Sequence, residues 1–247
     1  MQINSSQNKK FSSNQNFDYG GEDLDLLENA DNYFNLIINN FGNKIGNSIL
    51  EVGAGSGNLT YWLRKRFPNS KIVAIEPSDK MFSEIKNRNI ENVEIYQGFL
   101  SEYAEKFSNQ FDTIIYNNVL EHIEDDVAEM KTVNHILKKD GYLLSYNPAL
   151  NFLYDAHDAS VGHYRRYYKK ELTEKYVESG FVVESAKYHD LFGAVLMFIK
   201  YKVLKLKSID QGNAMTYFNT VLPVIDRIEK FIPIPAGKNL FVIGKKK

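Results

Sequence analysis

Apolar and polar positions along this chain follow two different periods. Short runs of mostly apolar residues predict buried strands, and apolar residues spaced by three or four predict helices. From residue 48 to residue 188 strand and helix signals alternate, which is typical of a parallel sheet with helices on both faces. We expect strands at residues 48–52, 71–75, 93–96, 111–116, 141–146, 181–188 and 240–244, helices near residues 79–87, 125–138 and 169–179, and one more helix that ends at Phe67.

Additional segments lie outside this alternating pattern. Residues 1–16 are polar and rich in Asn, Ser and Gln, so we expect a disordered tail, followed by one domain over residues 17–247. Residues 24–41 have apolar side chains on one helical side and predict a helix. Residues 191–235 form an insertion before the last strand, with two expected helices. The second of them should be kinked by Pro223.

Composition excludes several classes of function. The chain has 247 residues, 43% of them hydrophobic, which is enough for one full-sized core. The formal net charge is -1, so nothing favours bulk binding of nucleic acid. The absence of cysteine excludes disulfides, a thiol nucleophile and a thiolate metal site. The first residues lack the apolar run of a signal peptide, so we expect a cytoplasmic protein.

A glycine-rich turn follows the first expected strand. Residues 49–60 read Ile-Leu-Glu-Val-Gly-Ala-Gly-Ser-Gly-Asn-Leu-Thr, with Gly53, Gly55 and Gly57 at alternate positions. Glycines adopt positive φ and let backbone N–H groups approach a ligand closely. The second strand ends at Glu76, about 20 residues later, where a carboxylate can accept hydrogen bonds from ribose hydroxyls. Together these features predict a site for an adenosine-containing cofactor.

The glycine spacing distinguishes between cofactors. A dinucleotide fingerprint needs Gly-x-Gly-x-x-Gly, but here the third glycine comes one residue early and Asn58 stands in its place. Glu-Val-Gly-x-Gly-x-Gly resembles the first motif of class I S-adenosylmethionine-dependent methyltransferases. Residues 111–126, Phe-Asp-Thr-Ile-Ile-Tyr-Asn-Asn-Val-Leu-Glu-His-Ile-Glu-Asp-Asp, are similar to that family's fourth-strand motif. The resemblance covers residues 29–180.

This resemblance implies the fold and the cofactor. The fold would be an α/β, Rossmann-like, seven-stranded and mostly parallel sheet with an antiparallel last strand, and the helical insertion would lie between strands six and seven. The helix at 24–41 would cover S-adenosylmethionine, although Tyr33 can equally serve only to pack that helix. Phe99 stands where the family often has an acidic residue that binds adenine. The implied cofactor contacts are Tyr33, Glu51, Gly53, Ala54, Gly55, Gly57, Asn58, Glu76, Pro77, Met81, Gly98, Phe99, Asn117, Asn118 and Val119.

Three histidines are candidates for catalysis. Methyl transfer is an in-line displacement, and a hydroxyl nucleophile profits from a general base. His122 follows the fourth strand, whereas His157 and His163 lie in the loop after the fifth, and each can act as a base near neutral pH. His122 can instead cap its turn. We expect no metal ion, because His157, Asp158 and His163 lack further convergent ligands in the sequence.

The loop that contains His163 reads Gly-His-Tyr-Arg-Arg-Tyr. A similar run occurs in a branch of these methyltransferases that is often linked to sugar, glycolipid or cell-surface biosynthesis. By that resemblance Tyr164, Arg165 and Arg166 are candidates for substrate binding, since arginine binds carboxylates and phosphates in bidentate fashion. The alternative is that the arginines anchor the next helix through carboxylates and the tyrosines pack the loop.

The insertion begins with a basic amphipathic helix at residues 191–207. Its apolar run is too short to span a bilayer. Such a helix can lie on a membrane surface, close over a substrate, form a dimer contact or pack on its own domain. We make no prediction of the oligomeric state.

We therefore expect an enzyme that transfers a methyl group from S-adenosylmethionine to a small molecule, at a hydroxyl of a sugar-containing or lipid-linked acceptor. An aromatic, natural-product or quinone-type acceptor is the alternative within enzymes. A non-catalytic module that binds the cofactor and regulates a partner is the alternative outside them. A nucleic-acid methyltransferase is disfavoured by the charge balance and because Asn117-Asn118-Val119 lacks an Asp/Asn-Pro-Pro-Tyr-like motif.

Overall fold

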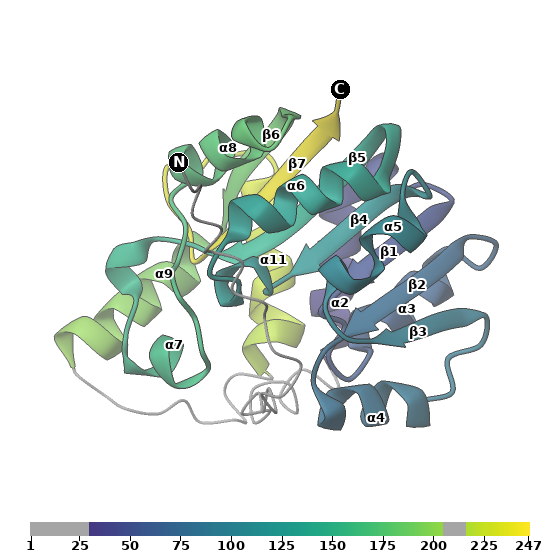
Figure 1. Ribbon diagram of the computed structural model, residues 1–247. Helices are drawn as coiled ribbons and strands as arrows, with labels where there is room; N and C mark the ends of the chain where they lie inside the picture. The colour runs from purple at the N-terminus through teal and green to yellow at the C-terminus, as the bar shows by residue number, and fades with distance from the viewer. Residues whose placement is uncertain (1–29, 205–215) are drawn as a thin grey trace, which may run out of the picture.

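The seven strands of the described residues lie in one sheet. The computed structural model describes residues 30–204 and 216–247 (Figure 1). The strand order is β3-β2-β1-β4-β5-β7-β6, and β7 pairs antiparallel to both of its neighbours, whereas the other pairs are parallel. The expected seven-stranded, mostly parallel sheet with an antiparallel last strand is confirmed. The strands are β1 (Ser48–Val52), β2 (Lys71–Glu76), β3 (Val93–Gln97), β4 (Phe111–Asn117), β5 (Leu137–Pro148), β6 (Phe181–His189) and β7 (Asn239–Lys246).

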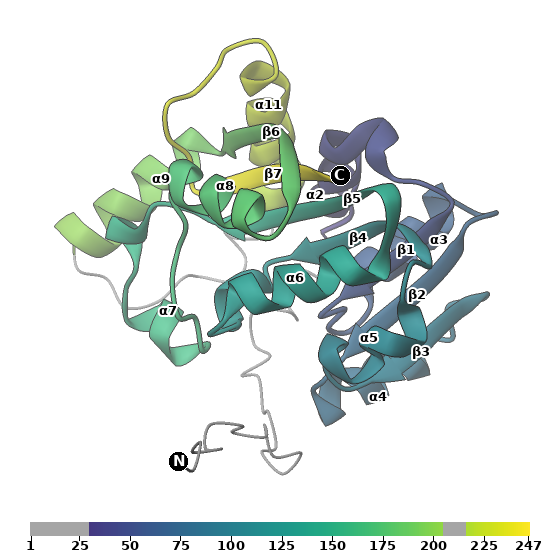
Figure 2. The same cartoon turned by 45° about the horizontal axis from the view of Figure 1, so that its top comes forward.

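Helices cover both faces of the sheet because alternate strand residues point to opposite sides (Figures 1 and 2). In β1, Leu50 and Val52 pack in the core with α6 and α8, and Ile49 packs in a second core with α2 and α3. Every residue of β1 is buried. The helices of this part of the chain are α2 (Asp31–Phe41), α3 (Asn58–Arg66), α4 (Asp79–Asn87), α5 (Ala104–Phe107), α6 (Asp126–Ile136), α7 (Ala156–Ser160) and α8 (Lys169–Glu178), with short turns η1 (Gly42–Lys44), η2 (Leu100–Tyr103), η3 (Leu120–His122) and η4 (Asn151–Leu153).

The boundary between α6 and β5 differs from the expectation. The helix was expected to reach residue 138, but it ends at Ile136, and β5 already begins at Leu137. Leu137 pairs with Phe111 of β4, and the next pairing joins Tyr142 to Thr113. The residues between them, with Asp140 at φ 63°, bulge out of the ladder. The turn at Asp140-Gly141 therefore lies inside β5 rather than before it.

The insertion between β6 and β7 is present, and its helices are only partly regular. Helix α9 (Leu191–Met197) continues into the π-helical turn η5 (Phe198–Val203). The second expected helix is divided into the π-helical turn η6 (Tyr217–Val221) and α11 (Leu222–Glu229). Pro223 lies next to this junction, and the Asn219 carbonyl, to which Pro223 has no N–H to donate, accepts a hydrogen bond from the Asn32 side chain at 2.8 Å. The backbone stays helical across the junction, so the hydrogen-bond pattern changes there while the helix continues.

Some expectations fall outside the described residues. These are the tail at 1–16, residues 24–29 of the first expected helix, and residues 205–207 of the amphipathic helix. From Asp31 onward the expected helix is present as α2, with Phe34, Ile37 and Phe41 buried against the sheet. Among the helices that the structure describes, none combines the length and the apolar character that crossing a membrane requires.

Strand β6 provides a stability test of this arrangement. Phe181 is 1% exposed and packs on Tyr176, so Phe181→Ala should lower the free energy of unfolding by about 3–5 kcal/mol. The next residue, Val182, is 47% exposed, and Val182→Ala should change that free energy by less than about 0.5 kcal/mol. Urea unfolding of both variants measures the difference. Equal losses would contradict the orientation of β6.

Candidate functional site

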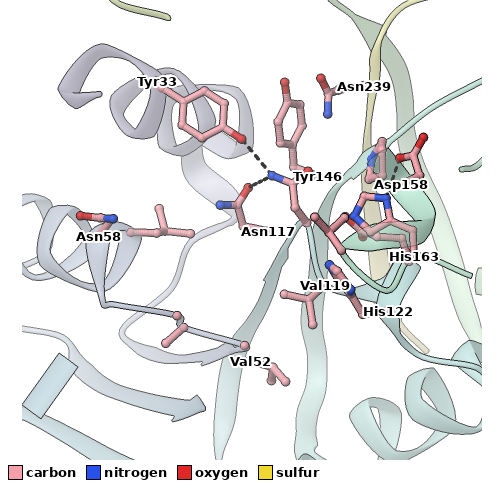
Figure 3. Close-up of a pocket in the computed structure, with 18 of the residues that line it drawn as sticks. Tyr33, Val52, Asn58, Asn117, Val119, His122, Tyr146, Asp158, His163 and Asn239 are labelled. Carbon is pink, nitrogen blue, oxygen red and sulfur yellow. Dashed lines mark hydrogen bonds and ion pairs between the residues drawn. The ribbon is translucent and has the colours of Figure 1, made fainter. Parts of the chain in front are cut away.

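A cavity of about 520 Å³ lies at the carboxyl ends of the parallel strands. Its volume is within the range of roughly 300–1,000 Å³ that is usual for small-molecule sites. The turn after β1, the end of β4 with η3, the loop around α7 and helix α9 all contribute side chains to it (Figure 3). Carboxyl ends of strands are the usual ligand position in open α/β sheets.

The glycine turn after β1 is shaped by two close contacts. Gly53, Gly55 and Gly57 have φ of 69°, 56° and 85°. A Cβ on Gly53 would lie 2.6 Å from Val119 Cγ2, and one on Gly57 would lie 2.6 Å from Ile85 Cγ1. The first glycine thus lets the end of β4 approach the turn, and the third lets α4 approach α3. The cavity is lined by Gly53 and Gly55, but not by Gly57.

Two buried carboxyls hold this turn. Glu51 accepts a hydrogen bond from the Thr60 hydroxyl at 2.5 Å, and burial raises its pKa to about 8 although that hydrogen bond lowers it. Glu76 accepts hydrogen bonds from the backbone N–H groups of Gly55 at 2.7 Å and Ser78 at 2.8 Å. Burial raises the pKa of Glu76, and the two backbone donors offset part of that shift. Each carboxylate oxygen has a second lone pair for a ligand.

Helix α2 reaches the cavity through Tyr33. The Asn118 side-chain amide donates a hydrogen bond to the Tyr33 hydroxyl at 2.9 Å, and the Asn118 backbone N–H donates to the Tyr146 carbonyl at 2.8 Å. Tyr33 is 4% exposed and packs edge-on against Tyr146 at 6.1 Å. It therefore packs the helix and also borders the cavity, so both expected roles are compatible with its position. Burial raises the pKa of its hydroxyl.

Charged side chains gather on the side of the cavity formed by η3 and the loop around α7. His163 Nδ1 lies 2.7 Å from Asp158 Oδ1, and Arg166 Nε donates to Asp158 Oδ2 at 2.8 Å. His163 Nε2 is 3.9 Å from Glu121 Oε1, and the rings of His122 and His163 are 4.5 Å apart (Figure 3). We call Glu121, His122, Asp158, His163 and Arg166 the polar cluster.

Burial dominates the electrostatics of the polar cluster. It raises the pKa of Glu121 to about 8, and no side chain that the structure describes makes a hydrogen bond to either Glu121 oxygen. Burial and the adjacent His163 lower the pKa of His122 to about 3. Burial alone would raise the pKa of Asp158, but hydrogen bonds from His163 and Arg166 outweigh it and hold that pKa at about 2.

Three residues expected in the site do not line the cavity, namely Gly57, Tyr164 and Arg165. Arg165 instead donates to the backbone carbonyls of Ile123 at 3.1 Å and Glu124 at 2.8 Å, and it pairs with Asp126 at 2.8 Å. Tyr164 is 54% exposed. Arg165 therefore pairs with a carboxylate, as the structural alternative expects, but with one on the preceding helix α6. The expected residues that do line the cavity are Tyr33, Glu51, Gly53, Ala54, Gly55, Asn58, Glu76, Pro77, Met81, Gly98, Phe99, Asn117, Asn118, Val119, His122, His157, His163 and Arg166.

Several cavity residues were not expected from the sequence. Glu121 had a signal, because a carboxyl beside a histidine follows the fourth strand in the motif at 111–126. Others come from distant segments and had no local signal. The unexpected lining residues include Tyr146, Asp190, Leu196, Met197, Lys200, Tyr217, Phe218, Lys238 and Asn239. Those that belong to the insertion show that α9 and η6 border the cavity.

Known proteins resemble the central part of the chain. Residues 50–143 match a family described as a methyltransferase domain. (S)-coclaurine N-methyltransferase of Thalictrum flavum subsp. glaucum is 29% identical over 104 residues, covering 40% of this chain and 28% of that protein. Malonyl-[acyl-carrier protein] O-methyltransferase 1 of Ilyobacter polytropus is 30% identical over 143 residues, covering 56% and 50%. The chain thus spans half or less of the length of these two relatives.

Solved structures share the fold over nearly the whole chain. A chain in the complex of the Haloferax volcanii Trm112 methyltransferase activator with a methyltransferase has a TM-score of 0.64 and 14% identity, covering 92% of this chain and 94% of that one. Phosphoethanolamine N-methyltransferase 2 of Haemonchus contortus, solved with S-adenosyl-L-methionine, has a TM-score of 0.60 and 17% identity, covering 87% and 52%.

The family match shows a methyltransferase domain over residues 50–143, and the solved structures share its fold. They leave the acceptor unspecified, since the relatives include both an N-methyltransferase and an O-methyltransferase.

The raised pKa of Glu51 generates a pH prediction. The unfolded carboxyl titrates near 4.5 and the folded one near 8, so the folded state binds the proton more tightly and stability falls as pH rises through this window. Glu51→Gln should remove that loss, on the order of 2–5 kcal/mol between pH 5 and pH 8.5. Urea unfolding without cofactor at both pH values measures it. The exposed Glu174→Gln is the control, and parallel pH curves for Glu51→Gln and wild type would contradict the prediction.

Proposed function

We propose that this protein transfers a methyl group from S-adenosylmethionine to a hydroxyl of a small sugar-containing or lipid-linked acceptor. One observation carries the proposal, namely that a single cavity joins the glycine turn to the polar cluster. Val119 packs against the turn at Gly53, and its carbonyl accepts a hydrogen bond from the His122 N–H at 3.0 Å. Val119 therefore links the glycine turn at one end of the cavity to Glu121 and His122 of the polar cluster, which follow it in η3.

This arrangement suits an in-line displacement. With the sulfonium beside Asn117 and Val119, an acceptor hydroxyl held at the polar cluster can approach the methyl carbon from the opposite side. The bond from oxygen to carbon forms as the bond from carbon to sulfur breaks, and S-adenosylhomocysteine leaves. Holding the two reactants in line can lower the barrier by about 7–11 kcal/mol.

The hydroxyl proton has to leave during the reaction, and the polar cluster is the proposed site of its loss. Removal of the proton by well-placed groups typically accelerates such steps by about 10²–10⁴-fold. Asp158 fixes the ring of His163 through Nδ1, so Nε2 lies on the side of Glu121. His122 and His157 border the same cavity. Arg166 acts on the reaction only by positioning Asp158, and Tyr164 and Arg165 have no part in the proposed site.

Residues 191–204 support a lipid-linked acceptor. Leu196, Met197 and Lys200 line the cavity, whereas another set of side chains on the same helical stretch points to solvent. Figures 1 and 2 show this stretch extending away from the sheet. It contains two lysines and no acidic residue. The outward set, at 43–59% exposure, is Phe192, Val195, Phe198, Ile199, Val203 and Leu204.

This apolar surface, with the exposed Lys202 beside it, matches an anionic membrane surface. The acceptor's polar head would enter the cavity beneath α9, and its lipid carrier would stay in the bilayer. An aromatic acceptor is the second candidate, because Tyr146, Tyr217 and Phe218 contribute rings to the cavity wall.

The cofactor assignment is tested by calorimetric titration with S-adenosylmethionine, S-adenosylhomocysteine and NAD. We expect the first two to bind and NAD not to bind. Gly55→Val should abolish binding, because Gly55 has φ 56° and its N–H holds Glu76. Gly42→Ala is the control, since Gly42 has a similar φ of 58° with nothing within 4 Å of an added Cβ. Binding of NAD alone would overturn the function.

The role of the polar cluster is tested separately with His163→Ala. It should retain the affinity for S-adenosylmethionine and slow the release of S-adenosylhomocysteine by about 10²-fold once an acceptor is supplied from a panel of glycolipid and polyprenyl-linked hydroxyls. An equal loss of cofactor affinity would show that His163 only supports the loop.

The membrane contact is tested by co-sedimentation with phosphatidylglycerol vesicles and with phosphatidylcholine vesicles. We expect binding to the anionic vesicles and a reduction of about tenfold in Ile199→Asp, which places a charge on the outward set. Val177→Asp on α8 is the matched control, because Val177 is 59% exposed but lies outside the insertion. Absence of binding by the wild type, or equal binding by both variants, would exclude this surface.

A further inference from the structure

We propose that Glu121, His122 and His163 bind a divalent transition-metal ion at the acceptor end of the cavity. One ligand atom from each of these residues lies within 4.8 Å of the other two. All three residues line the cavity, two of them on η3 and the third in the loop after α7. A cation bound between them would draw the three ligand atoms closer together, to about 2.0–2.2 Å from the ion.

The carboxyl of Glu121 is the strongest indication. Its side chain is 0% exposed, and neither oxygen has a hydrogen-bond partner among the residues that the structure describes. A buried carboxyl without a partner is costly, whereas a metal ion would bind it directly. The nearest cationic candidate, His163, remains 3.9 Å away. The space between the two side chains is therefore suited to a bound group rather than to a direct hydrogen bond.

His163 already makes the supporting hydrogen bond that is usual for metal-bound histidines. Metal-bound histidines usually donate their second ring N–H to a carboxylate, which fixes the ring orientation. His163 has this partner in Asp158, at 2.7 Å from Nδ1, so Nε2 is the atom left for the ion. Asp158 is itself held by Arg166 at 2.8 Å and by the backbone N–H of Asp155 at 3.0 Å.

The ligand set selects the kind of ion. Two imidazoles and one carboxylate suit Zn²⁺ or Fe²⁺, which leave positions open for a further ligand, and they suit Mg²⁺ and Ca²⁺ poorly. From the sequence we expected no metal ion, because His157, Asp158 and His163 lack further convergent ligands there. In the fold His157 is outside the ligand set, Asp158 supports His163, and Glu121 supplies the third ligand.

A bound ion would act as a Lewis acid, and this part of the inference rests on the proposed function. The acceptor hydroxyl would occupy an open position on the ion, which lowers the pKa of that hydroxyl. Its proton would pass to water. The resulting alkoxide would attack the methyl carbon as the carbon–sulfur bond breaks and S-adenosylhomocysteine leaves. The acceptor hydroxyl would then lose its proton while it is bound to the ion.

The binding site is tested on the purified full chain after treatment with a chelator. We expect calorimetric titration with Zn²⁺, and elemental analysis after dialysis, to give about one ion per chain. Glu121→Gln keeps the shape of the side chain and should weaken Zn²⁺ binding by at least about tenfold. His135→Ala is the control, since His135 lies on α6 with a side chain that is 47% exposed. It should bind Zn²⁺ like the wild type.

Failure of the metal site and failure of the proposed function give different results. Lack of stoichiometric Zn²⁺ binding by the wild type, or equal binding by Glu121→Gln, would overturn the metal site. Circular dichroism and the affinity for S-adenosylmethionine, which should be unchanged in Glu121→Gln, show whether that variant is folded. If a metal-free protein transfers methyl groups as fast as the loaded one, the catalytic role of the ion fails and the proposed function stands. If S-adenosylmethionine does not bind, the proposed function fails whether or not Zn²⁺ binds.

Discussion

The parallel pairing of β1 with β4 is the constraint on which the rest of the site depends. Val52 lies opposite Tyr116 in the ladder, so the chain leaves both strands at the same level and on the same edge of the sheet. Because of this register the turn at Gly53 meets Val119 within van der Waals distance. The glycine turn and the polar cluster consequently line the same cavity. A one-residue slip would turn these side chains to the opposite face.

Burial explains why the site contains so many interacting polar groups. The strand ends lie under α2 and the insertion, so carboxyls there lose the solvation that water would provide. Glu76 recovers it from two backbone N–H groups, and Asp158 recovers it from His163 and Arg166. Glu121 is the exception, because the described residues offer it no donor. The buried carboxyl beside the glycine turn therefore has hydrogen-bond donors, whereas Glu121 in the polar cluster has none among the described residues.

Sequence reasoning succeeded where the signal is local. The alternation of strand and helix, the three glycines and Glu76 each act within a few residues of their own position, and the fold follows from them. It failed to separate Arg165 from Arg166, because that difference depends on a long-range contact. Tyr167, the next residue, forms a bridge with Ala149, far away in the sequence. Arg166 faces Asp158 in the cavity, whereas Arg165 faces Asp126 beneath η3.

Hydrogen bonds at the edge of the cavity connect the insertion to the sheet. Glu229 of α11 accepts hydrogen bonds from the backbone N–H groups of Asp190 and Leu191, at 2.8 and 2.9 Å. The Asp190 side chain then caps α9 at Gly193 and accepts a hydrogen bond from Tyr217. The Asp190 carbonyl accepts one from Lys238, next to β7. The start of α9, η6 and the end of α11 are thus held at one point beside the cavity. Any movement of α9 that admits an acceptor has to break these hydrogen bonds or pivot about them, so Asp190 couples acceptor entry to the packing of both insertion helices.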